Sequence, residues 1–503
     1  LTAAALPSRL SPLNPAEIQS QSLLKDVAST AIYGSRGANG VVLVTTVKGK
    51  KRQGPQVTVN ARTTFNALPP QYEMLTPDEY GEMLWMSYDN SGIAPNHPIY
   101  GNGATPVLPK YIYPAVTDNA DLSLYHAYDY QIVESTPEGT NWLDEIYQKA
   151  LNQDYDMTIT GGAENVKYGV VFGYTDNNGS VKESGYNRFN FRSNVSIDLF
   201  KWLEVGENFG VRTQNDWGRQ SDGGEGSSIM MSMLMPRLCP VLDIEGNWAP
   251  VTKLAGFSSN RNEPSEIWRQ SDYTRKYTSL EGNIYAKARI LQNITAESTL
   301  GLYSGNGWNN YPTEANPWNY SGTSLDVLSV SSSNAKTWHW SNTIDYINTF
   351  GNHTVNALVG FEASSSRSES MGASRQSYFL QTPEYFVLDA GEGTQTNNGS
   401  FSESALASYF GRLHYDFRNK YYLDAVFRYD GSSVFAENNR WGAFPSFAAG
   451  WIVSEESFLT SSDWLDLLKV RASWGQSGNN RIGTYNGFST FQTNLNYSYY
   501  PIN

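Results

Sequence analysis

A strict alternation of apolar and polar residues is the feature that most constrains how this chain folds. In residues 187–199 one face is apolar and the other polar, with only Ser193 out of place. The apolar face carries Phe189, Phe191, Val195, Ile197 and Leu199. Successive side chains of a β-strand point to opposite faces, so this period predicts a strand with two chemically different surfaces. A slip of one residue would exchange the faces, and the register is therefore strongly specified.

The same period recurs along most of the chain. It is clear at 166–175 and at 420–430, where Tyr421, Leu423, Ala425, Phe427 and Tyr429 alternate with polar residues. Weaker versions lie at about 56–66, 155–162, 202–213, 277–291, 293–303, 337–348, 352–362, 405–417, 444–454 and 466–475. The sequence thus predicts roughly thirteen strands.

The segments between these strands alternate between short and long. Short connections occur at 161–165, 199–201, 291–293, 350–352 and 417–420. Long ones, at about 214–276, 304–336, 363–404 and 431–443, are rich in Gly, Asn, Ser, Trp and Tyr. Short turns on one rim and long loops on the other are typical of an outer-membrane β-barrel. The alternative is a large secreted all-β protein, a sandwich or a propeller.

Composition agrees with a barrel and excludes several other classes. Charged residues are 17% of the chain and mean hydropathy is -0.47, and no apolar run is long enough for a transmembrane helix. The net charge of -13 argues against nucleic-acid binding. The single cysteine, Cys239, cannot form an intrachain disulfide or a thiolate zinc site. We expect no enzyme activity, cofactor or metal: a GxSxG motif is absent, and the carboxylates of 222–226 lack the spacing of a Ca²⁺ loop.

The first fifty residues predict a small α/β unit instead of barrel strands. Asn14 is a good helix N-cap before Pro15, residues 28–33 predict a short helix ended by Gly34, and 41–46 predicts a buried strand. The segment GSRGANG (34–40) follows a helix and precedes a strand, which is the reverse of a phosphate loop, so we interpret it as a close-packed turn. The chain opens with neither Met nor a signal peptide, and an odd strand count cannot close a bacterial barrel. We therefore expect a piece of a longer protein.

Several blocks resemble one family in the same order. LLKDVASTAIYGSRGANGVVLVTTVKGK (23–50) resembles the C-terminal part of the plug domain of TonB-dependent outer-membrane transporters of the SusC/RagA family. Three further blocks, 139–150, 158–179 and 407–459, are similar to the same family, and the last continues into 467–483. The resemblance implies an antiparallel barrel of about 22 strands with a plug inside it. Residues 1–50 would be the end of the plug, and 51–503 the first part of the barrel.

The resemblance also implies a function, a location and partners. It implies TonB-dependent import of a bulky nutrient, an oligosaccharide or a peptide, across the outer membrane of a Gram-negative bacterium. The implied partners are a SusD-like surface lipoprotein that acts as a lid, the TonB protein of the inner membrane, and outer-membrane lipid. The alternatives are an adhesin or a passive pore on the same barrel, or a secreted β-rich glycan-active protein.

The candidate functional residues fall into three groups. The plug motif and a possible latch comprise Lys25, Asp26, Tyr33, Gly34, Arg36, Gly37 and Gly40. A cation inside a barrel needs a partner, so we expect Arg36 to pair either within the plug or with water, or with an inward-facing carboxylate. The inward carboxylates predicted by alternation are Glu204, Glu297, Asp345 and Asp424. In the predicted loop 308–322, the rings of Trp308, Tyr311, Trp318 and Tyr320 suit stacking on sugar or peptide groups, or else packing within the loop.

Overall fold

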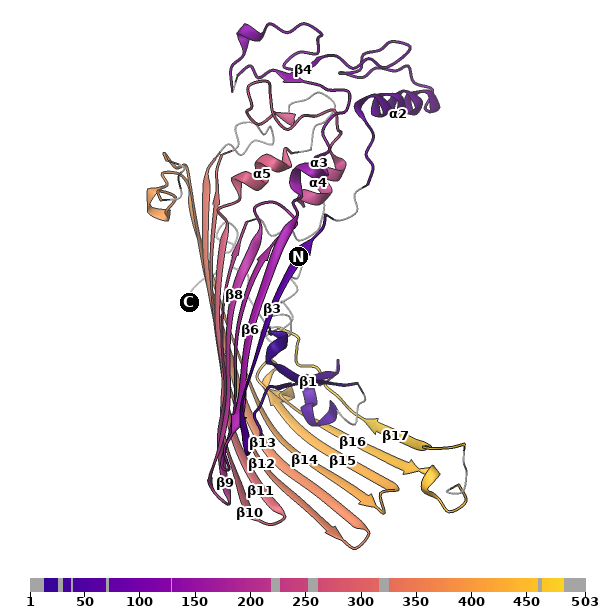
Figure 1. Ribbon diagram of the computed structural model, residues 1–503, viewed down its shortest axis with the longest axis vertical. Helices are drawn as coiled ribbons and strands as arrows, with labels where there is room; N and C mark the ends of the chain where they lie inside the picture. The colour runs from indigo at the N-terminus through magenta and orange to yellow at the C-terminus, as the bar shows by residue number, and fades with distance from the viewer. Residues whose placement is uncertain are drawn as a thin grey trace, which may run out of the picture.

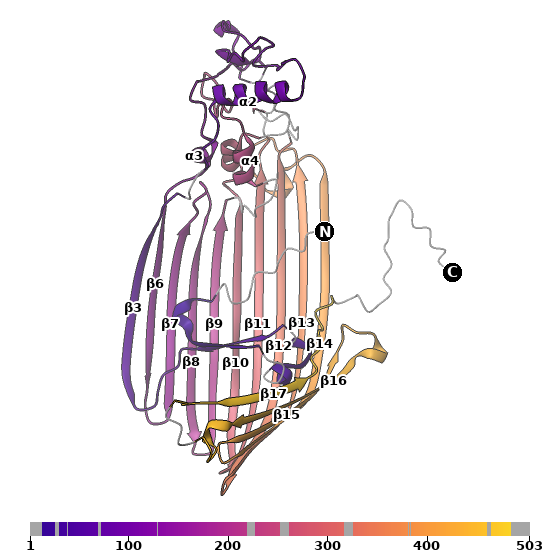
Figure 2. The same ribbon diagram turned by 90° about the vertical axis from the view of Figure 1, so that its right-hand side faces the viewer.

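The computed structural model shows a tall, curved antiparallel sheet that wraps around a small inner unit (Figure 1). It describes residues 13–25, 30–37, 39–68, 72–127, 129–218, 227–251, 261–315, 325–380, 382, 384–459 and 464–483. Among these residues, thirteen strands form one sheet in the order β17-β16-β15-β14-β13-β12-β11-β10-β9-β8-β7-β6-β3. Strands that follow one another in the chain are neighbours, as in an up-and-down barrel wall (Figure 2).

All thirteen predicted strands are present. Their bounds are β3 (Gln53–Asn66), β6 (Ala150–Gly162), β7 (Val166–Asn178), β8 (Gly185–Phe200), β9 (Leu203–Trp217), β10 (Thr274–Leu291), β11 (Ile294–Thr313), β12 (Val327–Phe350), β13 (His353–Gln376), β14 (Gln395–Phe417), β15 (Tyr421–Ser432), β16 (Trp441–Ile452) and β17 (Lys469–Gly475). Strands β12, β13 and β14 run for 24, 24 and 23 residues, well beyond the alternating segments that predicted them. Their extra length lies on the side of the long loops.

The two faces of the sheet are those predicted from alternation. On β8, Asn190, Arg192 and Asn194 are buried toward the concave side, whereas Phe189 is 42% exposed. On β15, Arg428 is buried and Phe427 is 54% exposed. The concave face is therefore polar and the convex face apolar, which is the arrangement of a barrel wall with lipid outside.

Aromatic rings form two bands on the convex face. Toward the long loops, ring centroids follow one another from Trp340 to Phe361 (6.2 Å), Phe361 to Tyr409 (5.2 Å) and Tyr409 to Trp441 (6.3 Å). Near the short turns, the rings of Phe417, Tyr421 and Trp451 stack on one another. On β15 the bands are marked by Tyr429 and Tyr421, about 26 Å apart along the strand. Because barrel strands tilt by about 35–45°, this length spans about 20 Å of membrane height, close to the apolar band of roughly 25 Å on outer-membrane barrels.

The inner unit, residues 13–47, lies on the concave side of the sheet (Figure 1). It consists of η1 (Pro15–Glu17), β1 (Ile18–Leu24), η2 (Ala31–Arg36) and β2 (Val41–Thr46), and β1 pairs with β2 in antiparallel fashion. Asn14 caps η1 as predicted, with its side chain accepting from the backbone N–H of Ala16. The predicted short helix is the 3₁₀ turn η2. The prediction that strand 41–46 is buried is wrong for several of its residues, because the described sheet of the unit has only two strands and leaves Val42 42% exposed.

The long connections build a folded layer above the sheet (Figure 2). It contains α2 (Pro77–Asn90), β4 (Tyr111–Tyr113), η3 (Leu122–Leu124), β5 (Val133–Glu134), α3 (Trp142–Ile146), α4 (Ser228–Leu234) and α5 (Glu263–Arg269). Short 3₁₀ turns elsewhere are η5 (Leu388–Ala390), η6 (Glu437–Asn439) and η7 (Val453–Glu455). A core that includes Trp85, Tyr100, Trp142 and Cys239 is buried in this layer. None of the helices in the described ranges has the length and apolar character needed to cross a membrane.

Candidate functional site

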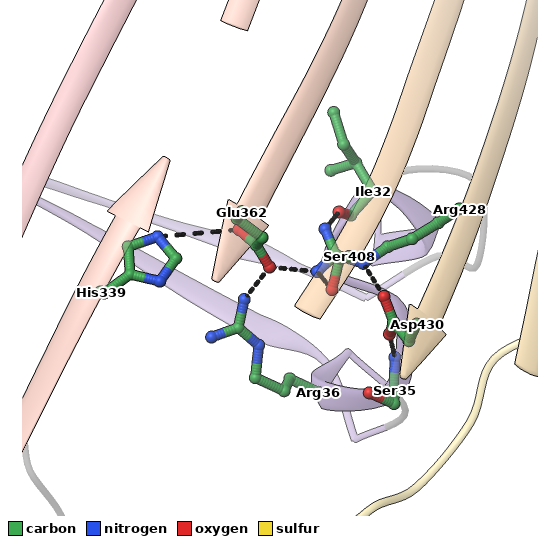
Figure 3. Close-up of polar contacts among 8 residues, drawn as sticks. All are labelled: Ile32, Ser35, Arg36, His339, Glu362, Ser408, Arg428 and Asp430. Atoms are coloured by element: carbon green, nitrogen blue, oxygen red, sulfur yellow. Dashed lines mark hydrogen bonds and ion pairs between the residues drawn. The ribbon is translucent and has the colours of Figure 1, made fainter. Parts of the chain in front are cut away.

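A buried cluster of charges joins the inner unit to the wall of the sheet. Its centre is Arg428 on β15, which is 1% exposed (Figure 3). The Arg428 guanidinium donates to Asp430 Oδ1 (2.6 Å), Ser408 Oγ (2.9 Å) and Glu362 Oε1. Its Nη1 donates to the carbonyl oxygen of Ile32 in the inner unit (2.6 Å). One wall side chain therefore binds three strands of the sheet and the backbone of the inner unit.

The turn of the inner unit that was predicted to be close-packed also contacts this cluster. The backbone N–H of Ser35 donates to Asp430 Oδ2 at 2.8 Å. Gly34 has φ +55°, and a Cβ there would lie 2.3 Å from Asp430 Oδ2. Only glycine satisfies both the left-handed backbone and the close approach. At Gly37 a Cβ would lie 2.6 Å from the Thr30 carbonyl oxygen, so this second glycine is also set by close packing.

Arg36 forms an ion pair with the wall, but with a different carboxylate from those predicted. Its Nη2 donates to Glu362 Oε1, the same oxygen that accepts a hydrogen bond from Arg428. His339 Nε2 lies 3.7 Å from the other oxygen of Glu362 (Figure 3). Two guanidinium groups and one imidazole thus converge on a carboxylate whose side chain is only 10% exposed. We call Arg36, Glu362, Arg428 and Asp430 the latch cluster.

The four predicted partners of Arg36 lie elsewhere, so that part of the prediction is wrong. Glu204 accepts from Tyr285 Oη (3.0 Å) and lies 3.5 Å from Lys167 Nζ. Glu297 lies 3.6 Å from Lys287 Nζ. Asp424 accepts from His414 and Arg412, and Asp345 forms no ion pair with any residue that the structure describes. All four sit within about five residues of a short turn, whereas Glu362 is nine residues up β13, at the height of the inner unit.

A second buried pair joins the other end of the inner unit to the opposite part of the wall. Arg192 on β8 donates through Nε to Glu17 Oε2 at 2.6 Å, and both residues are at most 6% exposed. The same guanidinium donates to Asn208 Oδ1 (2.9 Å) and to Glu281. The sequence alone did not single out Arg192, Glu17 or Glu281. Arg192 does belong to the predicted polar face of 187–199, and an arginine there is a signal for an inner partner.

Hydrogen bonds from asparagine side chains extend this contact along β2 and η1. Asn194 Nδ2 donates to the Val47 carbonyl oxygen (2.8 Å), and Asn208 Nδ2 donates to Thr46 Oγ1 (3.2 Å). Asn14 Nδ2 donates to Asp156 Oδ1 at 2.6 Å. The inner unit is therefore held by polar contacts to strands β6, β8 and β9 on one side and to β13 and β15 on the other.

The remaining residues of the predicted plug motif have simpler places. Lys25 is exposed just after β1, Gly40 precedes β2 with φ +89°, and Asp26 lies outside the described residues. Tyr33 lines a cavity of about 780 Å³ between the inner unit and β14 to β17. Burial first, and then the Glu362 carboxylate, raise the pKa of Tyr33 above its ordinary value, so this hydroxyl keeps its proton.

The predicted aromatic loop begins later than expected. Strand β11 continues to Thr313, so Trp308 and Tyr311 belong to a strand and not to a loop. Trp308 shares the convex face with Leu300 and Leu302, and Tyr311 packs on Tyr273 with ring centroids 5.1 Å apart. Trp318 and Tyr320, like the acidic segment 222–226, lie outside the described residues. Among the described residues no group of His, Cys, Asp or Glu has the geometry to hold a metal ion.

Taken together, the sheet, the two aromatic bands and the tied inner unit define a class of protein, an outer-membrane barrel with a plug. No family model matches the chain. It is 30% identical over 519 residues to the TonB-dependent receptor SusC of Bacteroides thetaiotaomicron. The aligned region covers 98% of this chain and 46% of SusC. The chain is 31% identical over 484 residues to the TonB-dependent receptor P26 of Formosa agariphila, covering 95% of this chain and 44% of the relative.

Comparison with solved structures supports the same class of fold. The RagAB peptide importer in its open-open state superimposes with a TM-score of 0.77 at 24% identity, over 97% of this chain and 53% of that one. Over nearly its whole length the chain matches outer-membrane TonB-dependent receptors of the SusC type, and its fold is that of RagAB. It spans about half the length of the curated relatives it matches.

Proposed function

We propose that this chain is the end of the plug (1–50) and the first part of the barrel (51–503) of a transporter that imports a bulky nutrient with energy from TonB. The observation that carries the proposal is the tie between inner unit and wall. Removing one partner from a buried ion pair costs about 3–5 kcal/mol, and here Arg428 and Arg192 each hold such a pair. A unit tied this firmly on the polar face leaves the lumen only when work is done on it.

The source of that work follows from the location. The outer membrane has no nucleotide supply, so the work comes from the inner membrane, and TonB is the protein after which the relatives are named. We propose that the latch cluster is the contact that breaks when TonB pulls on the plug. The cluster is suited to it, because a buried ion pair is strong when dry and loses its strength once water enters.

A lid and a substrate class complete the proposal. The folded layer above the sheet, with its core around Trp85 and Trp142, offers a broad docking surface for a SusD-like lipoprotein. RagAB is a peptide importer, and SusC is a receptor of the same family. We propose an oligosaccharide or a peptide as the cargo, because both are too large to diffuse past a tied plug.

The test is uptake of the native substrate by cells with and without TonB, at a substrate concentration too low for diffusion. The expected result is loss of uptake in the strain that lacks TonB, with normal amounts of the transporter in the outer membrane. Undiminished uptake would refute energised import and favour a passive pore. The lid is tested separately, by purifying the transporter in mild detergent and asking whether a lipoprotein accompanies it.

A further inference from the structure

A groove of about 830 Å³ crosses the convex, lipid-facing side of β9 to β14. Its walls are mostly apolar and exposed: Leu302 and Ile284 are each 61% exposed, and Phe209, Leu280, Leu300 and Trp338 add to them. The carboxylate of Glu207, which accepts from Ser193 Oγ at 2.7 Å, lies at the β9 side of the groove. Small residues, Gly282, Ser304 and Ser365, lie along it and leave the space open. These strands are in the middle of the sheet, so both neighbours of each are present and the groove is not an edge effect.

The groove changes character at the end nearest the long loops. There it is lined by Lys336 on β12, Arg367 on β13 and Glu403 on β14, which share one rung of the sheet. Lys336 lies two residues beyond Trp338, or about 7 Å further along the strand. Trp338 is next to the outer aromatic band, so these charges lie at the level of lipid headgroups in the outer leaflet.

The two cations are presented differently. Arg367 donates through Nε to Glu369 Oε1 (2.8 Å) and its Nη2 reaches the same oxygen, while its guanidinium lies 4.8 Å from the centroid of the Phe401 ring. These contacts fix the side chain and leave the donors of Nη1 available. Lys336 makes no ion pair with any other residue that the structure describes. The carboxylates of Glu403 and Glu369 lie beside Arg367 and repel an anion from that side. An anion is therefore favoured on the side of Arg367 that faces Lys336.

We propose that this groove binds a phosphate-bearing glycolipid of the outer leaflet, of the lipid A class. An acyl chain lies along Leu280, Leu300 and Leu302, and a phosphate lies on Lys336 and the Nη1 edge of Arg367. Each part of the groove matches one part of such a lipid: the apolar walls match the chain, and the unpaired amine matches the phosphate. This proposal needs only the outer-membrane location and does not depend on the transport mechanism.

The experiment measures binding of lipid A to the full-length transporter by native mass spectrometry in detergent. Lipid A with its phosphates is compared with the same lipid after both phosphates are removed. For the wild type we expect about fivefold tighter binding of the phosphorylated form, as one lysine–phosphate contact near a membrane surface provides. In Lys336→Gln this preference should disappear, whereas in Ser304→Phe, which fills the groove, both forms should bind more weakly.

The matched control is Lys276→Gln. Lys276 is also exposed on the convex face near the long loops, but it does not line the groove. We expect it to behave as the wild type, and heat-modifiable migration on a gel confirms that each variant has a folded barrel. Equal binding of the two lipid forms by the wild type, equal effects of the two lysine substitutions, or recovery of a protein in place of lipid on this face would each overturn the proposal.

Discussion

Replacement of Arg428 by methionine is the most direct test of the latch cluster. Methionine keeps much of the volume but removes the guanidinium that joins Glu362, Asp430, Ser408 and the Ile32 carbonyl oxygen. The side chains of Glu362 and Asp430 are 10% and 2% exposed, so each would become a buried carboxylate with its main cation gone.

The expected cost follows from that burial. Breaking a buried ion pair costs about 3–5 kcal/mol. The cost falls on the docked state of the inner unit, because the released unit lets water reach both carboxylates. The population of the released state should therefore rise by a factor of roughly 10² to 4 × 10³, since 1.4 kcal/mol is a factor of ten.

Hydrogen exchange at the Ser35 amide reports this release. That N–H donates to Asp430 Oδ2 in the docked state and exchanges when the contact opens. In the full-length transporter we expect exchange in the peptide around residues 30–37 to accelerate by the factor above. Glu362→Gln is a milder second variant, which keeps the shape and removes one charge, and should give an intermediate rate.

The matched control is Arg412→Met. Arg412 also lies on the concave face, but its side chain is 48% exposed and its contact to Asp424 is 3.4 Å long. Such an exposed pair contributes less than about 1 kcal/mol, so the exchange rate should change by no more than roughly fivefold. Equal exchange in Arg428→Met and Arg412→Met would refute the latch.

Three further predictions follow from the described geometry. Gly34→Ala should weaken docking of the inner unit, since its Cβ would meet Asp430 Oδ2, and the midpoint of thermal release measures this. Ala425→Arg, on the lipid face midway between the two bands, should cost roughly 2–4 kcal/mol in denaturant unfolding, whereas Ala448→Arg on the lumen face should be tolerated. Burial, and then its bond to Asp243, raise the pKa of Tyr125 in the loop layer to about 12, above the ordinary 10.0. The neutral phenol therefore stabilises the layer fully below pH 10, and this stability is lost as pH rises toward 12; Tyr125→Phe should remove one phenol from the late part of the ultraviolet titration.

The strands show how much of the fold the alternation of apolar and polar residues can predict. It located all thirteen strands of the described sheet and assigned their faces correctly, because inside the membrane the two faces meet lipid and a polar lumen. It missed the upper parts of β12, β13 and β14, where residues such as Ser370 and Ser400 form a cross-strand pair at 2.7 Å. Above the membrane both faces meet water, so the alternation ends although the hydrogen-bonded ladder continues. Trp308 and Tyr311 were assigned to a loop for the same reason.

The latch shows what only the tertiary structure decided. The turn GSRGANG, its close packing and the need of Arg36 for a polar partner all follow from local chemistry in the sequence. Arg428 and Asp430 belong to the polar side of the predicted strand 420–430, but the sequence did not single out Glu362 or Asp430 as inward carboxylates. The choice of Glu362 over Glu204, Glu297, Asp345 or Asp424 depends on the height at which the inner unit sits in the barrel. That height is set by contacts such as Arg192 with Glu17, between residues 175 positions apart, which no local pattern can encode.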